Sequence, residues 1–321
     1  MLIKDKDLSS PSSVHRIGRL RTSNYDISNI CNLRCDGCLY FSGAGQEIRN
    51  AESRIQVWRD FFASEAKRGV NFAYVAGAEP SLTPDRIRAC HDHIPMGVIF
   101  TNGTKPIARD IGYRIHVSVW GDEAGSRRYR GADINRKAMG NYVDDDRAVF
   151  VMTLNAHNLP EVGAVAKACR DHRVKLTFSL FSPTTEYNQS SVAAADNLRL
   201  GAAQLAACRE TILWAEQEYP QTVRISRNFI DWVTQERSLY TLDDAGIATD
   251  CGNRLTRHHV HYNADLTRNS GKCCSPNLDC RDCRPYAMSL ATYFNRRRQM
   301  PSDWPLVWDF WSELFLPLRA L

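Results

Sequence analysis

The sequence has 321 residues, 43% of them hydrophobic and 24% charged, which is enough for one large domain with a smaller one and a sizeable core. Its 41 Lys and Arg against 36 Asp and Glu leave a net charge of +5, spread along the chain and too mild to predict a nucleic-acid partner. The polar start over 1–13 is no signal peptide, and no run of about 18 apolar residues predicts a membrane span. We therefore expect a cytoplasmic protein, in which 11 cysteines indicate metal binding or catalysis rather than disulfides.

Strand-like and helix-like apolar patterns alternate from residue 23 onwards. After a segment over 23–30 and a cysteine-rich loop, helical spacing recurs over 57–66, 84–91 and 159–172, and strand-like runs over 71–76, 96–100, 115–119, 148–154 and 175–181. This alternation predicts parallel βαβ units. About six units are too few for a closed eight-stranded barrel. We therefore predict an α/β fold, a partial (β/α)6 TIM-like barrel with its active site at the carboxyl ends of the strands.

The second half of the chain predicts a loop, a helix and a change of character. The segment 182–197 is rich in Ser, Thr and Asn and predicts a loop over the barrel mouth; a helix over 198–219 follows and ends at Pro220. From Thr241 the chain is polar and rich in Cys and Arg, which is typical of a segment that needs a metal to fold. Apolar residues at helical spacing near the end predict a helix packing back on the barrel. The expected regions are 1–22 (extension), 23–230 (barrel), 241–290 (cysteine-rich domain) and 291–321 (terminal helix).

Three cysteines, Cys31, Cys35 and Cys38, carry most of the functional information. Three thiolates this close can hold three irons of a 4Fe-4S cluster, and no fourth cysteine lies near them, so one iron stays open. A zinc site, the alternative, would want a fourth ligand, and neither His15 nor His91 is suitably placed. The spacing Cys-x3-Cys-x2-Cys resembles the signature of the radical S-adenosylmethionine (SAM) enzymes. The resemblance implies a partial barrel in which the open iron binds SAM and an electron from the cluster cleaves it to methionine and a 5'-deoxyadenosyl radical.

The resemblance continues in the string Gly77-Ala78-Glu79-Pro80, directly after the second strand. It is similar to the Gly-Gly-Glu-Pro motif of the family, with Ala78 in place of the second glycine. The resemblance implies that the Glu79 carboxylate hydrogen-bonds the amino group of SAM. In many members an aromatic residue before the third cysteine packs on the adenine, and here Tyr40 or Phe41 would replace it, unless backbone contacts alone hold the adenine.

Later strands add further matches to the SPASM-type branch of the family. Thr101 and Asn102 end the third strand near the expected adenosyl group, and Ser118 with Arg130 matches residues that contact the ribose and carboxylate of SAM. Trp120 stands where an Asp is common, and a solvated charge run is the alternative interpretation of the arginines. The expected SAM-binding set is Tyr40, Gly77, Ala78, Glu79, Pro80, Thr101, Asn102, Ser118, Arg130 and Asn155.

A second group of cysteines lies near the end of the chain. Together with a strand over 258–263 and a turn over 269–271, it resembles the cysteine-bounded hairpin of SPASM and twitch domains. The resemblance implies one auxiliary 4Fe-4S cluster, because a full SPASM domain needs more cysteines than are present, and a zinc ribbon is the alternative. The expected ligands are Cys251, Cys273, Cys280 and Cys283. The adjacent Cys274 would be spare, as a hydrogen donor to a substrate radical or as a buried small hydrophobe.

Other cysteines and histidines have simpler interpretations. Cys90, Cys169 and Cys208 lie on apolar helix faces and are expected in the core. The histidines over 258–261 are expected at the surface or in a substrate pocket rather than on a metal.

The sequence thus predicts a radical SAM enzyme with SAM and two 4Fe-4S clusters as cofactors. The resemblance implies hydrogen abstraction from a C-H bond of a small polar natural product, such as a sugar, an aminoglycoside or a nucleoside, leading to dehydrogenation or epimerisation. A flavodoxin- or ferredoxin-type electron donor would be its partner. One alternative is modification of a ribosomal peptide, with a separate protein as leader-binding partner because the sequence shows no such domain of its own. A zinc-stabilised binding module is the non-catalytic alternative.

Overall fold

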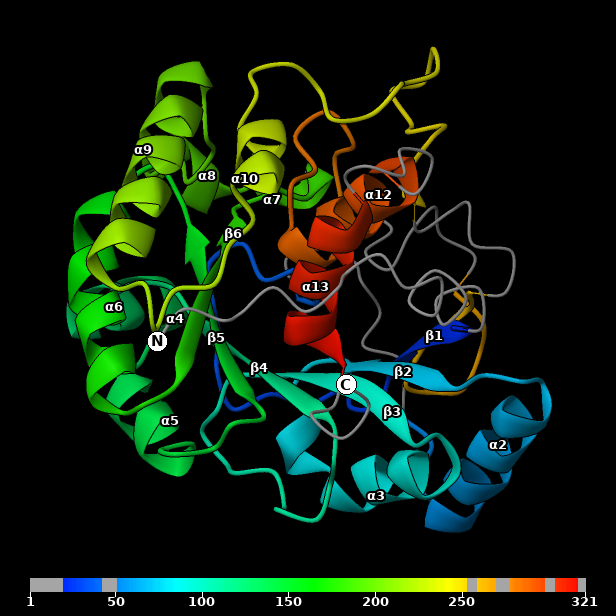
Figure 1. Cartoon of the computed structure of the whole chain (residues 1–321). Coiled ribbons are helices and arrows are strands. Elements are labelled where there is room, and N and C mark those ends of the chain that lie inside the picture. The colour runs from blue at the N-terminus through cyan, green and yellow to red at the C-terminus, as the bar shows by residue number, and fades with distance from the viewer. Residues whose placement is uncertain (1–19, 42–50, 253–258, 270–277, 298–303, 317–321) are drawn as a thin grey trace.

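The computed structural model describes residues 20–41, 51–252, 259–269, 278–297 and 304–316. Seven parallel strands form one sheet in the order β6-β5-β4-β3-β2-β1-β7 and curve into an arc (Figure 1). The strands are β1 (Thr22–Asp26), β2 (Phe72–Ala76), β3 (Met96–Thr101), β4 (Arg114–Val119), β5 (Ala148–Leu154), β6 (Lys175–Leu180) and β7 (His261–Tyr262). The first six pair with their neighbours in chain order, as the βαβ pattern predicted. The α/β partial barrel is therefore confirmed.

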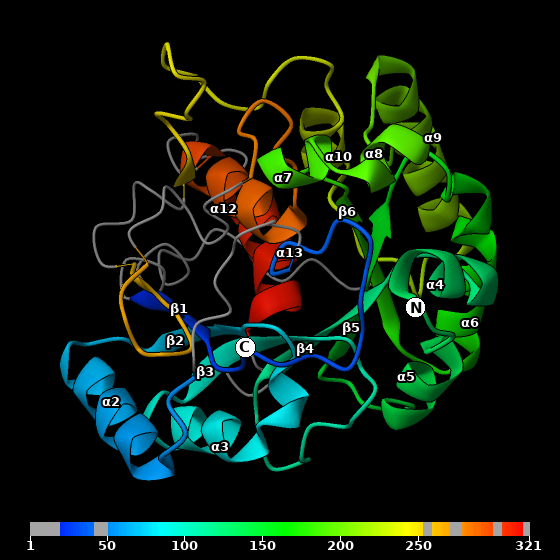
Figure 2. The ribbon, with the colours of Figure 1, turned by 180° about the vertical axis from the view of Figure 1, so that it is seen from behind.

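Helices cover the convex face of the sheet, as both ribbon views show (Figures 1 and 2). They are α2 (Ile55–Lys67), α3 (Pro84–His93), α4 (Glu123–Arg130), α5 (Asn135–Asn141), α6 (Val162–Asp171) and α9 (Ala202–Glu218). Their buried faces follow the helical spacing of the sequence, with Trp58 and Phe62 on α2 and Val165 on α6. The predicted core cysteines are confirmed: Cys90, Cys169 and Cys208 are all fully buried.

The segment 182–197 is not the loop that its composition predicted. It forms two short helices, α7 (Thr185–Asn188) and α8 (Ser191–Ala195). The polar residues that favoured a loop act as N-caps, because Thr184 Oγ1 accepts from Tyr187 N at 3.0 Å and Ser190 Oγ accepts from Ala193 N at 3.1 Å. The next helix, α9, begins after Gly201, later than the spacing predicted.

The strand β7 joins the barrel sheet and also pairs back, antiparallel, with Arg268 in a short hairpin. His261 and Tyr262 pair in parallel with Asn24 and Tyr25 of β1. The chain then turns at 263–267, where Leu266 N donates to the Asn263 carbonyl at 2.8 Å. Asn269 N bonds back to the carbonyl of His261 at 2.7 Å, and the rest of the turn expected over 269–271 lies outside the described residues. Asp265 fixes the earlier turn by accepting from Thr267 N and Oγ1.

The C-terminal helices lie on the concave face of the arc, enclosed by the strands (Figures 1 and 2). They are α12 (Tyr286–Arg297) and α13 (Trp304–Phe315), and a shorter α10 (Arg227–Val233) packs beside α12. Arg114, the first residue of β4, donates to the Leu316 carbonyl at 2.7 Å, and Trp311 packs on Phe72 with ring centroids 5.8 Å apart. The end of the chain thus fills the barrel interior beside the first half of the strands.

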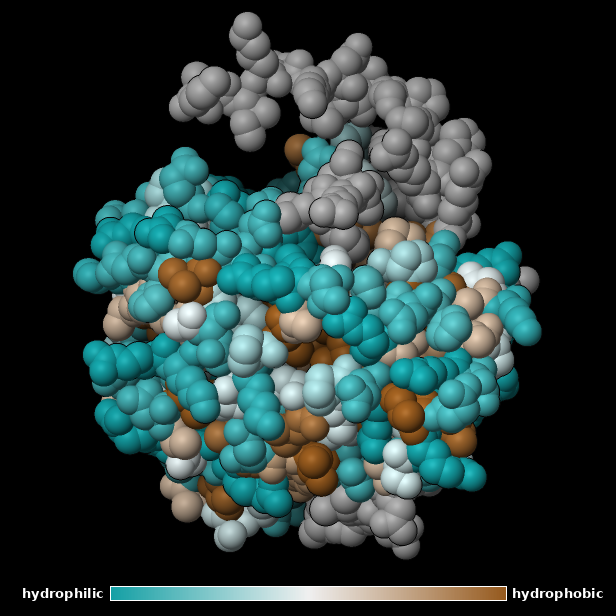
Figure 3. All heavy atoms as spheres, turned by 90° about the horizontal axis from the view of Figure 1, so that it is seen from below, coloured by the Kyte–Doolittle hydropathy of each residue, from teal (hydrophilic) through white to brown (hydrophobic). Residues whose placement is uncertain are grey.

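The described surface carries few large apolar side chains. The three most exposed are Leu306, Ile30 and Trp214, and they come from different parts of the chain. Leu306 is 62% exposed and Trp214 is 44% exposed. The face in Figure 3 is mostly hydrophilic, with apolar residues in small patches. Among the helices of the described residues, none has the length and apolar character needed to cross a membrane.

Candidate functional site

A cavity of about 330 Å³ lies inside the arc of strands, a size typical of small-molecule sites. Alternate residues of the strands line it because side chains of a strand point inward at every second position. It is completed by the cysteine loop, the turn after β2 and the start of α12. Its lining is Asn24, Asp26, Cys38, Leu39, Tyr40, Tyr74, Ala76, Gly77, Ala78, Phe100, His116, Ser118, Val151, Thr153, Ser179, His259, Pro285, Tyr286, Ala287 and Met288.

The cysteine loop runs between β1 and α2, with Cys31, Cys35 and Cys38 all half-buried. Cys38 N donates to the Cys35 carbonyl at 3.3 Å, and Cys38 lines the cavity. Burial raises the pKa of the Cys31 and Cys38 thiols, so a bound cation would be needed to keep them as thiolates. In the described part of the chain, no three Cys, His, Asp or Glu side chains stand in ready metal-binding geometry. The loop thus supplies the right donors close together, without a preformed cage.

The turn after β2 holds the start of the cysteine loop. Gly77 has a φ of 120°, and a Cβ there would lie 2.6 Å from the Ser28 carbonyl oxygen. Ala78 N donates to that carbonyl at 2.9 Å, and Glu79 N donates to the Ile30 carbonyl at 3.0 Å. The two sequence motifs are therefore in direct contact, and only glycine allows this approach.

Glu79 does not line the cavity, so its contact with the amino group of SAM stays a prediction. The residue is 1% exposed. Its carboxylate accepts from Ser81 N at 3.0 Å, Thr101 Oγ1 at 2.6 Å and Asn102 N at 2.7 Å. Glu79 therefore ties the turn after β2 to the end of β3, with two of these bonds on Oε1 and one on Oε2.

Asn102 contacts the cysteine loop and does not line the cavity, so its expected adenosyl contact stays a prediction. Its Nδ2 lies 3.8 Å from Cys31 Sγ and 2.9 Å from Asn32 Oδ1, while its Oδ1 accepts from Thr104 N at 2.9 Å. Thr101 is turned to Glu79, and Pro80 is buried at the start of a short helical turn. None of the three lines the cavity.

Ser118, Arg130 and Asn155 gather near the carboxyl ends of β4 and β5. Ser118 lines the cavity, and its carbonyl accepts from the guanidinium of Arg130. Arg130 Nε and Asn155 Nδ2 are buried donors without a partner in the described structure. Unpaired buried donors are costly unless a ligand or water satisfies them, so both fit a polar ligand at this end of the strands.

Trp120 shows why this segment departs from the family pattern. Its ring packs edge-on against Phe181, with centroids 5.8 Å apart, and lies 6.4 Å from Tyr129. Arg130 is 3% exposed, which excludes the solvated charge run for this arginine. The helix α4 that carries Arg130 is capped by Asp122 and ends at Gly131, which has a φ of 73°.

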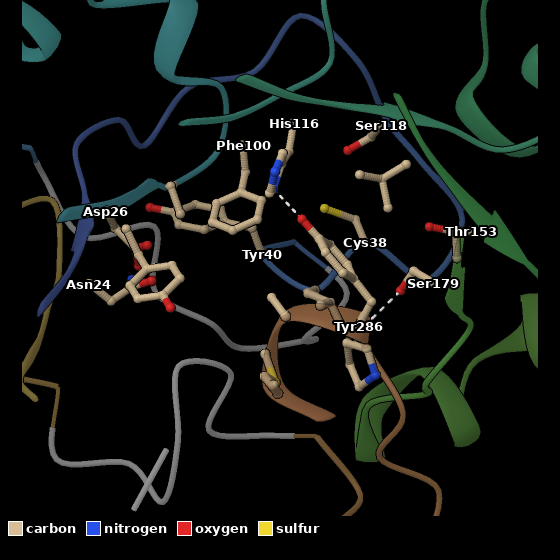
Figure 4. A pocket seen from close by; sticks show the side chains of 18 of the residues that line it. Asn24, Asp26, Cys38, Tyr40, Phe100, His116, Ser118, Thr153, Ser179 and Tyr286 are labelled. Atoms are coloured by element: carbon tan, nitrogen blue, oxygen red, sulfur yellow. Dashed lines mark hydrogen bonds between the residues drawn. The ribbon is translucent and has the colours of Figure 1, made fainter. Parts of the chain in front are cut away.

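A hydrogen-bonded pair, His116 and Tyr286, forms part of the cavity wall and was missed from the sequence. His116 Nε2 donates to the Leu314 carbonyl at 2.7 Å, so Nδ1 is the acceptor for the Tyr286 hydroxyl (Figure 4). Burial lowers the pKa of His116 to about 3, which keeps the ring neutral. Strand alternation from Ser118 would have placed His116 on this face, but nothing in the sequence indicated Tyr286.

Two histidines near β7 reach the cavity region. His259 lines the cavity, as the sequence allowed, and burial lowers its pKa to about 4. His261 Nε2 lies 3.0 Å from Asp26 Oδ2. His258 lies outside the described residues.

The second cysteine group is partly assembled. Cys251, Cys280 and Cys283 are at most 8% exposed and belong to the same core. Cys251 and Cys283 both lie near Tyr240, whose pKa is raised by burial and then by these thiols. Cys251 and Cys283, far apart in the chain, thus lie near one residue, whereas the three described thiols do not form a ready metal-binding group. Cys273 and Cys274 lie outside the described residues.

Comparison with known proteins shows the fold. No family model matches the sequence, and no curated protein matches it. The structure matches Streptococcus suis SuiB bound to S-adenosylmethionine with a TM-score of 0.53 and 14% identity, over 76% of this chain and 58% of that chain. SuiB bound to precursor peptide SuiA matches with a TM-score of 0.52 and 13% identity, over 82% of this chain and 66% of that chain. Native anSMEcpe with bound AdoMet matches with a TM-score of 0.53 and 14% identity, over 78% of this chain and 74% of that chain. The chain therefore spans less than two thirds of the length of SuiB.

Proposed function

We propose that this chain is a radical SAM enzyme that takes a hydrogen atom from a C-H bond of its substrate. The observation that carries the proposal is the cysteine loop itself. It is fixed by the turn after β2 and by Asn102, and it borders a cavity at the carboxyl ends of a parallel partial barrel. Two solved structures with this fold hold SAM.

In this proposal Cys31, Cys35 and Cys38 bind a 4Fe-4S cluster. The cluster, when bound, supplies the electron that cleaves SAM to methionine and a 5'-deoxyadenosyl radical. Gly77 and Ala78 bring backbone close to the SAM site, and Tyr40 lines it. The buried donors of Arg130 and Asn155 would meet polar groups of SAM, beside Ser118.

An auxiliary 4Fe-4S cluster is part of the proposal. Cys251, Cys280 and Cys283 are the described ligands, and Cys273 is the proposed fourth. Such a cluster would accept the second electron of a dehydrogenation. The alternative, zinc at the same thiols, would give a colourless protein.

A peptide is the substrate that the comparisons support, because one matching structure is SuiB bound to precursor peptide SuiA. A small polar natural product is the second candidate, and the cavity volume of about 330 Å³ favours it. Dehydrogenation and epimerisation are the proposed outcomes for either substrate. An electron donor of the flavodoxin or ferredoxin type would be the partner.

The test is anaerobic reconstitution followed by iron analysis and an assay for 5'-deoxyadenosine. The wild type should carry about eight irons in two clusters and cleave SAM when reduced. The triple variant Cys31→Ala, Cys35→Ala, Cys38→Ala should keep about four irons and cleave none. Zinc in place of iron in the wild type would reject the proposal. Faster 5'-deoxyadenosine formation with a peptide encoded beside the gene, rather than with amino sugars, would identify a peptide substrate.

A further inference from the structure

The cavity has an unusual balance of charge. Its described lining contains one carboxylate, Asp26, and no Lys or Arg. Its two histidines, His116 and His259, are kept neutral because burial lowers their pKa values to about 3 and about 4. Burial also raises the pKa of Tyr286 well above its usual range, so this phenol is neutral as well. The formal charge of the described wall is therefore negative and comes from one side chain.

Asp26 is placed to use that charge. It is the last residue of β1, and its side chain is 15% exposed. His261 Nε2 lies 3.0 Å from Oδ2, which fixes the carboxylate from the side of β7. The carboxylate also helps to raise the pKa of Tyr40, although burial is the larger cause, so Tyr40 lies near it. In the described residues no further hydrogen bond to the Asp26 carboxylate is formed, so this cavity-lining side chain keeps acceptor capacity.

The rest of the cavity wall combines polar side chains with aromatic rings. Figure 4 shows Asn24 and Asp26 on one side and the hydroxyls of Ser118, Thr153 and Ser179 on the other. Tyr74 and Phe100 also line the cavity, as stacked rings with centroids 6.4 Å apart and planes at 8°. Aromatic faces beside a carboxylate attract an ammonium group. A phosphate or carboxylate would instead meet Asp26 without any cationic side chain of the described wall.

We infer that the substrate carries an amino group and that Asp26 binds it as an ammonium ion. This inference rests on the proposed function and names a chemical class for its substrate. The amine can belong to a lysine side chain of a peptide or to a small molecule, because both present the same group. Asp26 is then a specificity residue that touches the substrate away from the reacting C-H bond.

Calorimetric titration of the reconstituted protein, with SAM and without reductant, tests this with two matched pairs of probes. Cyclohexylamine and cyclohexanol represent small molecules, and Nα-acetyl-lysine methylamide with its norleucine analogue represents peptides. At least one amine should bind roughly tenfold to a hundredfold more tightly than its neutral partner, as expected for a charge-assisted hydrogen bond. The pair that shows the difference identifies the source of the amine. Equal binding within both pairs, or no binding of either amine at millimolar concentration, overturns the inference.

Two variants make the test specific. Asp26→Asn keeps the shape of the side chain and should abolish the preference for the amine. Thr153→Val removes a hydroxyl from the other side of the cavity without changing charge, and it should keep the preference. A preference that survives in Asp26→Asn overturns the inference.

Two further readouts separate this inference from related explanations. SAM also carries an amine, so the affinity of the wild type and of Asp26→Asn for SAM is measured by equilibrium dialysis. A loss of SAM affinity in Asp26→Asn as large as its loss of amine affinity would assign Asp26 to SAM and overturn the inference. Cleavage of SAM by the wild type reports on the proposed function itself. Cleavage without a preference for amines rejects only the inference, whereas a protein without iron or cleavage rejects the proposed function.

Discussion

The side-chain amide of Asn102 lies 3.8 Å from the sulfur of Cys31. This contact joins the end of β3 to the first cysteine of the loop. The backbone N-H of Asn102 also donates to Glu79, so three segments that are separate in sequence meet here. The geometry of the cysteine loop is therefore set by residues outside it.

Replacing Asn102 should loosen the iron site. Asn102→Ala removes the donor to Cys31 Sγ and the bond to Asn32, while its backbone bond to Glu79 remains. We expect faster loss of iron from the first cluster to a chelator, measured by the decay of the visible absorbance. The control is Asn197→Ala, which removes an exposed asparagine whose Oδ1 accepts a hydrogen bond from Arg199 N. Equal rates in both variants would argue against a role for Asn102 at the loop.

Replacing Glu79 should disturb structure before it disturbs SAM binding. Glu79→Gln places an amide donor among three groups that themselves donate, so buried donors lose their acceptor. The cost is about 1–3 kcal/mol for each unsatisfied group. We expect a lower thermal midpoint and less iron retained, along with weaker SAM binding. Glu210→Gln, at an exposed position, should change none of these. A stable Glu79→Gln protein with full iron that loses only SAM affinity would support the direct contact.

Two glycines give opposite expectations for the same substitution. Gly77→Ala adds a Cβ 2.6 Å from the Ser28 carbonyl at a φ of 120°. The strain alone costs about 1–3 kcal/mol, and relief of the clash would displace the cysteine loop. Gly140→Ala, in α5, meets nothing within 4 Å and should be neutral or stabilising by up to about 1 kcal/mol. Thermal midpoints of the two proteins should therefore move in different directions, and a harmless Gly77→Ala would contradict the close approach.

Acid should destabilise the protein in part through His116. Its folded pKa is lowered to about 3 from a usual value of about 6.5, so only the unfolded chain takes up a proton between these values. Stability conferred by this group is complete above about pH 6.5 and is lost as the pH falls, by about 2 kcal/mol at pH 5. His116→Gln can still bond Leu314 and Tyr286 but does not titrate. The drop in thermal midpoint between pH 7.5 and 5 should be smaller in this variant, and the value at pH 7.5 reports its packing cost separately. An unchanged drop would mean that His116 is protonated in the folded state.

The C-terminal cysteines should separate into ligands and core residues. Cys251→Ala should remove about four of about eight irons and lower the solubility, because folding of the cysteine-rich segment is expected to be coupled to its metal. Cys208→Ala removes a fully buried thiol of α9 and should keep all of the iron. Iron analysis of both proteins after reconstitution decides the matter. Full iron in Cys251→Ala would exclude Cys251 from the auxiliary site.

Sequence periodicity determined the barrel because it is a local property. The five predicted strand-like runs recur as β2 to β6 with bounds shifted by at most one residue, since buried parallel strands need apolar runs and their helices need apolar stripes. Cysteine spacing is equally local, so the position of the first metal loop could be read directly from the sequence. Composition was less reliable: in 182–197 the Ser and Thr side chains that favoured a loop serve as helix caps.

The roles of side chains were decided by the tertiary structure. A motif shows that Glu79 follows β2 but not which donors meet its carboxylate, and β3 supplies two of the three. Likewise, Asp26, His116 and Tyr286 are far apart in sequence and line one cavity only because the arc of strands and α12 enclose it. Long-range contacts follow from packing that no local pattern encodes. The sequence therefore determined the fold and the candidate metal-binding cysteines, and only the folded chain showed which groups face the cavity.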